Sequence, residues 1–234
     1  MRYIERIEKD DLEKQDYLET KDDLEKNAFH EDASIREYLL QRYGQKCCYC
    51  ENEINASSVA EVDHFYPQKI KKGVENPLHD IVYDIRNFHI SCHRCNHNKG
   101  MYHNQALSPN YFFKGTSWCL SSKDFIEKNI TYLGPVLYAG QDFKEFFNRL
   151  KINGHNFSPK KGTCKSLLYD RAKYLYETQT LLDTCAQLIQ INNKSPQLKN
   201  LFRLVSQRFE KDAKYSTMII QNLGKFFLKL KELM

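Results

Sequence analysis

The chain has 234 residues, of which 41% are hydrophobic and 28% charged, and its formal net charge is +5. This composition excludes a disordered chain and supplies a core for one domain or for two small ones. The mild positive charge is compatible with a nucleic-acid partner but does not identify one.

No apolar run approaches the ~20 residues that span a bilayer. Residues 1–6 are charged where a signal peptide would be apolar. We therefore expect a cytoplasmic protein with no membrane partner. In a reducing compartment, eight cysteines favour metal binding over disulfides.

The first predicted element is an N-terminal helix or extended arm in residues 10–26, which are strongly charged with leucines at roughly helical spacing. A short helix is predicted over residues 33–43, because its apolar side chains share one face and Gly44 follows as a stop signal. We assign residues 1–43 to an N-terminal helical arm.

A cysteine-rich module follows in residues 44–103. Residues 59–65 alternate like a β-strand, and Phe88 and Ile90 indicate a second short strand. A helix is expected to begin at Cys95. Between the strands, residues 67–86 contain prolines, a glycine and several lysines and are predicted to be a loop.

Residues 104–234 are assigned to a mainly helical C-terminal region. Its first part, up to about residue 140, has a mixed pattern, and the helical pattern begins after it. Its apolar stripes are interpreted as core or interface, and the region as a scaffold, a surface for partner docking or a dimerisation surface. The stripes include Phe146, Phe147, Leu150, Leu167, Leu175, Tyr176, Leu182, Cys185, Leu201, Leu204, Val205, Met218, Ile219, Leu223 and Leu230.

Two Cys-x-x-Cys pairs, Cys47 with Cys50 and Cys92 with Cys95, predict a zinc site. Each pair can supply two thiolates to one tetrahedral ion at ~2.3 Å, and a site closed by four cysteines is structural. The alternative is two unrelated turns that contain cysteines. Residues 51–91 separate the pairs, which is more than the roughly 15–20 residues of common zinc ribbons.

This wide gap carries Asp63 and His64, and Asn87 and Asn96 flank the second pair. His64 has a near-neutral unperturbed pKa, so it can take a proton from water. Asp63 offers a hard oxygen ligand for magnesium or manganese, and Asn96 a neutral one. Asn87 would fix the His64 ring by a hydrogen bond. Neighbours on a strand point to opposite sides, so convergence requires a twist or bulge.

Simpler interpretations remain open for each residue. Asp63 and His64 would be a surface pair, Asn87 a turn residue and Asn96 a helix cap. Most of the nearby histidines are expected to face solvent or phosphate; the four are His89, His93, His97 and His103.

Three motifs in residues 44–103 together resemble those of the HNH endonucleases with a zinc-bound ββα-metal core. They are C-x-x-C, V-D-H-F-x-P and N-x-x-x-x-C-x-x-C-N-x-x-K-G. The resemblance implies that His64 is the general base, Asp63 the metal-binding acid and Asn87 the middle asparagine. Asn96 falls on the final metal ligand in place of a histidine. Which of Asn96 and its neighbour His97 reaches the ion stays open.

The resemblance also implies a fold class: α+β, mostly α, with a small ββα-metal core stapled by four cysteines between N-terminal helices and a helical C-terminal half. A narrower resemblance rests on the Met-Arg-x-Ile start, residues 150–153 (Leu-Lys-Ile-Asn) and Arg171. These features are similar to the PtuB-like nucleases of Septu and retron-associated anti-phage systems. Such nucleases pair with an ATPase, PtuA, which implies a PtuA-like partner.

Nucleic-acid contacts are expected from basic side chains, since such a core mainly meets the sugar-phosphate backbone. Solvated loops are the alternative for every basic cluster, and phosphate contacts carry no base information. No helix-turn-helix, zinc-finger or homeodomain signature is present. The candidates are Lys69, Lys71, Lys72, Arg94, Lys99, Lys160, Lys161 and Lys165.

Three functions follow from the sequence. The first is a metal-dependent DNA endonuclease of anti-phage defence, with structural zinc and catalytic Mg²⁺ or Mn²⁺. The second is a zinc-stabilised nucleic-acid-binding or adaptor module without activity. The third is a stand-alone restriction-type nuclease that finds its own site. A homodimer is compatible with all three.

Overall fold

In the computed structural model, contacts divide the chain into two compact units, which are described separately. The first unit contains residues 139–150 and the described residues up to 102; the second contains residues 130–138 and those from 151 onward. The structure describes residues 33–54, 60–71, 74–75, 82–83, 85–102, 130–153, 167–192, 195–210 and 213–233. The predicted arm at 10–26 and the lysines at 160–165 lie outside these ranges.

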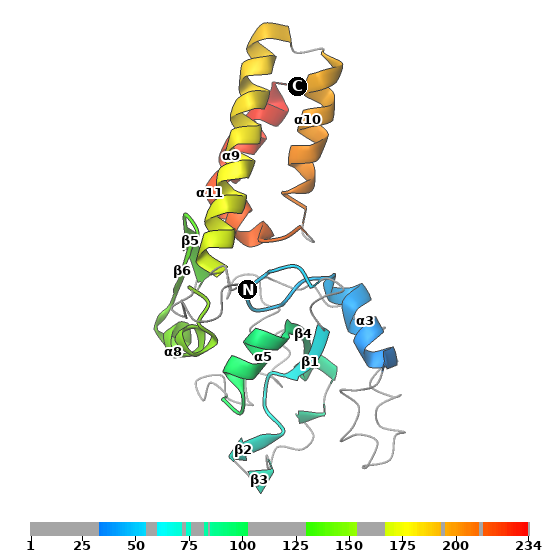
Figure 1. The fold of residues 1–234 in the computed structure, drawn as a ribbon, viewed down its shortest axis with the longest axis vertical. Coiled ribbons are helices and arrows are strands. Elements are labelled where there is room, and N and C mark those ends of the chain that lie inside the picture. The colour runs from blue at the N-terminus through cyan, green and yellow to red at the C-terminus, as the bar shows by residue number, and fades with distance from the viewer. Residues whose placement is uncertain are drawn as a thin grey trace, which may run out of the picture. The chain divides into compact units, whose positions relative to one another are not determined.

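The centre of the first unit is an antiparallel pair of strands followed directly by a helix (Figure 1). Strand β1 (Ala60–His64) pairs with β4 (Phe88–Cys92), and helix α5 (His93–Lys99) follows β4 without a loop. The register places Val62 opposite Ile90, and both are buried. The predicted strand–strand–helix order is therefore observed, with the helix beginning two residues before its predicted start.

Helix α3 (Ala33–Tyr43) coincides with the short helix predicted from the sequence. Ile35 and Leu39 are fully buried, and α3 packs on β4 and β1. Gly44 ends the helix with a φ of 69°, a conformation that glycine adopts without strain. The helix therefore belongs to the strand–strand–helix centre.

Helix α8 (Gln141–Leu150) also packs in the first unit, against α5. Its Phe146 ring lies 5.6 Å from the Tyr49 ring and 5.5 Å from the Phe65 ring, centre to centre. Such aromatic packing supplies apolar burial that the short strands alone cannot provide. Through Phe146 the helix thus contacts both the Cys47–Cys50 segment, at Tyr49, and the segment that follows His64, at Phe65.

The predicted loop at 67–86 contains a second, smaller pair of strands. Strand β2 (Lys69–Lys71) pairs antiparallel with β3 (Val74–Glu75), with an irregular register between Lys69 and Lys71. The loop prediction was therefore wrong for these residues, whose short polar strands carry too little apolar alternation to be recognised.

A β-hairpin in the second unit was not predicted. Strands β5 (Ile130–Leu133) and β6 (Val136–Ala139) meet at a turn in which Gly134 has a φ of 57°. Amide side chains bond to the backbone of both strands: Gln221 to Ile130 and Tyr132, and Asn153 to both polar groups of Leu137. These bonds satisfy outer edges that would otherwise be open to pairing with another strand.

Three long helices complete the second unit: α9 (Leu167–Asn192), α10 (Pro196–Gln207) and α11 (Ser216–Glu232) (Figure 1). Both α10 and α11 pack on α9. Two residues of the predicted core or interface stripes do not belong to the core: Tyr176 is 74% exposed and Leu204 is 50% exposed. Each belongs to a stripe wider than the face its helix buries.

The predicted core includes the buried residues Phe146, Phe147, Leu150, Leu167, Leu182, Cys185, Val205, Met218, Ile219, Leu223 and Leu230. Among the described helices, none combines the length and the apolar character that crossing a bilayer requires.

Candidate functional site

The two Cys-x-x-Cys pairs meet in one cluster. The sulfur atoms of Cys47, Cys50, Cys92 and Cys95 all lie within 4.8 Å of one another. The Cys50 and Cys92 sulfurs are 3.9 Å apart. Tetrahedral zinc–sulfur bonds of ~2.3 Å place neighbouring sulfurs about 3.8 Å apart, so this spacing suits a metal such as zinc. Over the part of the chain that the structure describes, no other cluster of three or more such ligands is found.

Backbone hydrogen bonds bring the first pair to the second. The Cys48 amide donates to the Ile90 carbonyl at 2.9 Å, which ties the turn to β4. The Glu51 amide donates a hydrogen bond to the Cys47 carbonyl at 2.9 Å and so closes the turn. Glu51 has a φ of 57°. The second pair lies at the junction of β4 and α5, so two local structures converge on one point.

The pKa shifts of the four cysteines indicate why a cation suits them. Burial raises the pKa of the Cys47 thiol, whereas hydrogen bonds from Cys47, Cys92 and Cys95 hold the pKa of Cys50 well below its usual value. Hydrogen bonds with Cys47 and Cys50 raise the pKa of Cys92 and Cys95. A metal ion would favour the ionised form of all four thiols, against the raised pKa of Cys47, Cys92 and Cys95.

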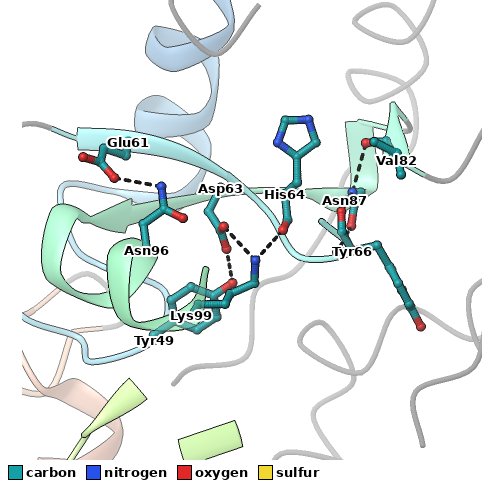
Figure 2. A network of polar contacts seen from close by, with 9 residues as sticks. All are labelled: Tyr49, Glu61, Asp63, His64, Tyr66, Val82, Asn87, Asn96 and Lys99. Atoms are coloured by element: carbon teal, nitrogen blue, oxygen red, sulfur yellow. Dashed lines mark hydrogen bonds and ion pairs between the residues drawn. The ribbon is translucent and has the colours of Figure 1, made fainter. Parts of the chain in front are cut away.

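Beside this cluster, β1 and α5 line a cleft of about 460 Å³. Three of the four predicted catalytic residues line it: Asp63, His64 and Asn96. Figure 2 shows Asp63 and His64 leaving the strand in opposite directions, as strand alternation requires. Asn87 does not line the cleft. Two oxygen-bearing side chains and one imidazole thus line the same cleft, with the imidazole on the other face of β1.

His64 is buried at the end of β1, among aromatic rings. Its ring centre lies 5.0 Å from that of Phe88 and 6.1 Å from that of Tyr83, both nearly perpendicular. These edge-to-face contacts favour the orientation of the imidazole seen here. A general base needs such a fixed orientation toward the proton that it removes.

Asn87 holds the chain after His64 rather than the imidazole itself. Its Oδ1 accepts from the Tyr66 amide at 2.8 Å, and its Nδ2 donates to the carbonyls of Tyr66 and Val82 at 3.0 Å each (Figure 2). The Asn87 carbonyl accepts from the Phe65 amide at 3.0 Å. The expected hydrogen bond to the His64 ring is replaced by a clamp on the backbone.

Asp63 lies in a buried polar network on the opposite face of β1. Lys99 donates to Asp63 Oδ1 at 2.9 Å and to the His64 carbonyl at 2.6 Å, and the Tyr49 hydroxyl donates to Asp63 Oδ2 (Figure 2). Burial raises the pKa of the Asp63 carboxyl, although Lys99 and Tyr49 act in the opposite direction. An ionised carboxylate has about four acceptor positions, so two remain for a further partner.

Asn96 is held by an acidic residue that the sequence did not single out. Its Nδ2 donates to Glu61 Oε2 at 2.7 Å, and His93 Nδ1 lies 2.6 Å from Glu61 Oε1. His97 is exposed, stacks on His93 and is absent from the cleft lining. Of the two candidates for the final metal ligand, Asn96 is therefore the one at the cleft.

The predicted phosphate-binding residues lie in different surroundings. Lys69 is exposed and lines the cleft. Lys99 also lines it, but its ammonium is buried against Asp63. Arg94 is absent from the lining; partial burial lowers its pKa, but the charges of the four cysteines outweigh this and raise it. The Lys71 side chain and Lys72 fall outside the described residues.

Sequence reasoning missed three residues of this region. Glu61 lies two positions before Asp63, and strand alternation could have placed it on the same face. Arg36, from α3, lines the cleft. Tyr49, inside the first Cys-x-x-Cys pair (Cys47 and Cys50), bonds to Asp63. The last two meet the site only through folding, which no local pattern reveals.

The fold and the site define a mostly helical α+β protein with small antiparallel sheets and a four-cysteine cluster that can hold a metal. No family model matches the chain, and no solved structure matches it significantly.

Two characterised proteins are similar to this chain. It is 34% identical to the Septu protein PtuB of Bacillus mycoides (strain KBAB4) over 73 residues, which cover 29% of this chain and 25% of that protein. It is 30% identical to the Septu protein PtuB of Bacillus thuringiensis over 127 residues, covering 50% of this chain and 46% of that protein. The chain thus has a PtuB-like relation over up to half of its length, and the matches span less than half of either relative.

Proposed function

We propose that this chain is a metal-dependent endonuclease of the HNH type that hydrolyses DNA phosphodiester bonds. The observation that carries the proposal is the cleft lined by Asp63, His64 and Asn96, in a unit that also contains a four-cysteine cluster and a strand–strand–helix centre. Phosphodiester hydrolysis needs a deprotonated water and a positive charge near the scissile phosphate. The cleft contains residue types suited to both tasks.

In this mechanism His64 takes the proton from the attacking water. The surrounding rings hold its imidazole in place, and Lys99 binds its carbonyl. Asn87 clamps the two residues that follow. A base anchored on both sides keeps its geometry while the substrate changes charge.

Asp63 and Asn96 would hold the catalytic Mg²⁺ or Mn²⁺. One carboxylate and one amide oxygen form the donor set that these hard ions prefer. Lys99 and Tyr49 each occupy one acceptor position of Asp63, and the two that remain would be available to the ion. The bound ion would supply Lewis-acid polarisation of the scissile phosphate.

Zinc is the metal that we assign to the four cysteines, in a structural role. A closed tetrahedral site has no position for substrate or water. The ion would hold the Cys47 turn against the junction of β4 and α5. Because α5 carries Asn96 and Lys99, a defect in this site would also displace the cleft residues.

The PtuB-like relation supports a defence role for the whole protein. We propose that the chain is an effector of an anti-phage system that acts on DNA together with a PtuA-like ATPase. Lys69, exposed at the cleft, is the described residue best placed to meet a phosphate from outside.

The test is cleavage of supercoiled plasmid with Mg²⁺ or Mn²⁺, with and without a PtuA-like ATPase. Wild-type chain is compared with His64→Ala and with His97→Ala, an exposed histidine of the same unit. Cleavage that disappears only in His64→Ala supports the mechanism. Full activity of His64→Ala rejects it, whereas a loss in His97→Ala would assign the final metal ligand to that residue.

A second candidate is a zinc-stabilised nucleic-acid-binding or adaptor module without activity. The observation that favours it is the engagement of both Asp63 oxygens by Lys99 and Tyr49. Plasmid that stays intact with every divalent ion and with the ATPase, while DNA is still bound, would select this module. A stand-alone restriction-type nuclease would instead cut without the ATPase and at defined sites.

A further inference from the structure

Glu61 shares one face of β1 with Asp63. The two residues are separated by one position, and alternate side chains of a strand point to the same side. Both line the cleft together with Asn96. Glu61 is therefore an acidic group inside the candidate site to which the proposed mechanism assigns no task.

Both carboxylate oxygens of Glu61 are engaged by α5. Oε2 accepts from Asn96 Nδ2 at 2.7 Å, and Oε1 lies 2.6 Å from His93 Nδ1. The Glu61 side chain is only 26% exposed, which limits the competition from water for these bonds. Hydrogen bonds to an ionised carboxylate are about twice as strong as neutral ones.

This contact decides which end of the Asn96 amide faces the cleft. An ionised carboxylate only accepts hydrogen bonds, so it selects the NH₂ end of an amide. The Oδ1 atom is then turned away from Glu61. In Figure 2 the amide nitrogen faces Glu61, and the oxygen lies on the side of Asp63. A metal ion can use only that oxygen.

We propose that Glu61 is a positioning residue that holds the Asn96 amide with its oxygen directed to a divalent cation shared with Asp63. The inference rests on the proposed metal site. Partners behind metal ligands typically change metal affinity by 10–100-fold when removed. Glu61 acts in this way through Asn96 and not as a ligand of its own.

The test is the affinity of the zinc-loaded chain for Mn²⁺, measured without DNA by electron paramagnetic resonance of the free ion. The variants are Glu61→Ala, Glu61→Gln, Asn96→Ala and the double variant Glu61→Ala with Asn96→Ala. Glu53→Ala, at an exposed acid outside the cleft lining, controls for the loss of one negative charge. Zinc content and circular dichroism verify that each variant is folded.

We expect Glu61→Ala to weaken Mn²⁺ binding about tenfold or more. Glu61→Gln should retain most of the affinity, because the glutamine oxygen still accepts from Asn96. The double variant should bind no more weakly than Asn96→Ala, since Glu61 acts only through that residue. Glu53→Ala should bind as the wild type does.

Three results would overturn the inference. Wild-type affinity in Glu61→Ala, or no binding by the wild type, removes the positioning role. An equal loss in Glu61→Gln makes Glu61 a charged ligand, and a further loss in the double variant gives it an effect independent of Asn96. A chain that binds Mn²⁺ as expected but never cuts DNA refutes the nuclease proposal alone, whereas one that cuts DNA with normal affinity in Glu61→Ala refutes this inference alone.

Discussion

Lys99 forms a buried ion pair with Asp63, at 2.9 Å between Nζ and Oδ1. The same ammonium donates to the His64 carbonyl at 2.6 Å. One cation, from the last turn of α5, therefore contacts two consecutive residues of the candidate site. The sequence predicted Lys99 near a phosphate, but here its ammonium lies inside the protein and binds this pair.

Replacing Lys99 with methionine is expected to destabilise the first unit. Lys99→Met keeps most of the side-chain volume but leaves the buried Asp63 carboxylate with Tyr49 and without its counter-ion. Removing one partner of a buried pair costs about 3–5 kcal/mol, and the Tyr49 bond places the expected loss near the lower end. Urea unfolding of the zinc-loaded chain measures this loss.

The matched control for this prediction is Lys69→Met. Lys69 is exposed, so its removal should change the free energy of unfolding by no more than about 0.5 kcal/mol. Equal stability of Lys99→Met and Lys69→Met would show that the buried pair contributes nothing to the fold.

Zinc binding should depend on Cys50 but not on its neighbour Cys48. Cys50 belongs to the cluster of four sulfurs, whereas Cys48 is buried outside that cluster. We expect Cys50→Ser to lose zinc and the folded signal of the first unit, because the site stabilises a region with a small core. Cys48→Ser should retain zinc. Elemental analysis of the purified variants decides, and full zinc content in Cys50→Ser contradicts the four-cysteine site.

Local periodicity was sufficient to predict several elements. The helix at 33–43 and the strands around Val62 and Ile90 follow from apolar residues at spacings of 3.6 and 2. The four-cysteine cluster followed from a spacing that itself suits a metal. In these cases the information lies in short local patterns, one for each helix or strand and one for each cysteine pair.

Features that depend on distant residues were missed. The hairpin β5–β6 is stabilised by amides outside it: Asn153 lies 16 residues from Leu137, and Gln221 lies 89 residues from Tyr132. Lys99 could not be paired with Asp63 from sequence, since a lysine in a motif gives no sign of burial. The Asn87 clamp on Tyr66 likewise depends on how the chain returns after β1.

Asn87 should be needed for the position of His64 as well as for stability. Asn87→Ala removes three side-chain hydrogen bonds and leaves the buried Tyr66 and Val82 groups unsatisfied. Each such group costs about 1–3 kcal/mol, so the free energy of unfolding should fall by at least about 2 kcal/mol. Asn87→Asp should also be destabilised, because it loses both donor bonds. Unfolding curves equal to the wild type would contradict the clamp.

DNA affinity should depend on Lys69 more than on Arg94. Both were predicted to contact phosphate, but only Lys69 lines the cleft, and Arg94 lies beside the cysteines. Each phosphate contact contributes about 0.9 to the slope of log affinity against log salt. In a His64→Ala background, which prevents cutting, Lys69→Ala should lower that slope by about one contact, and Arg94→Ala should leave it unchanged. Fluorescence anisotropy over a salt series measures both slopes, and the reverse order would move the DNA path from the cleft to the cysteine cluster.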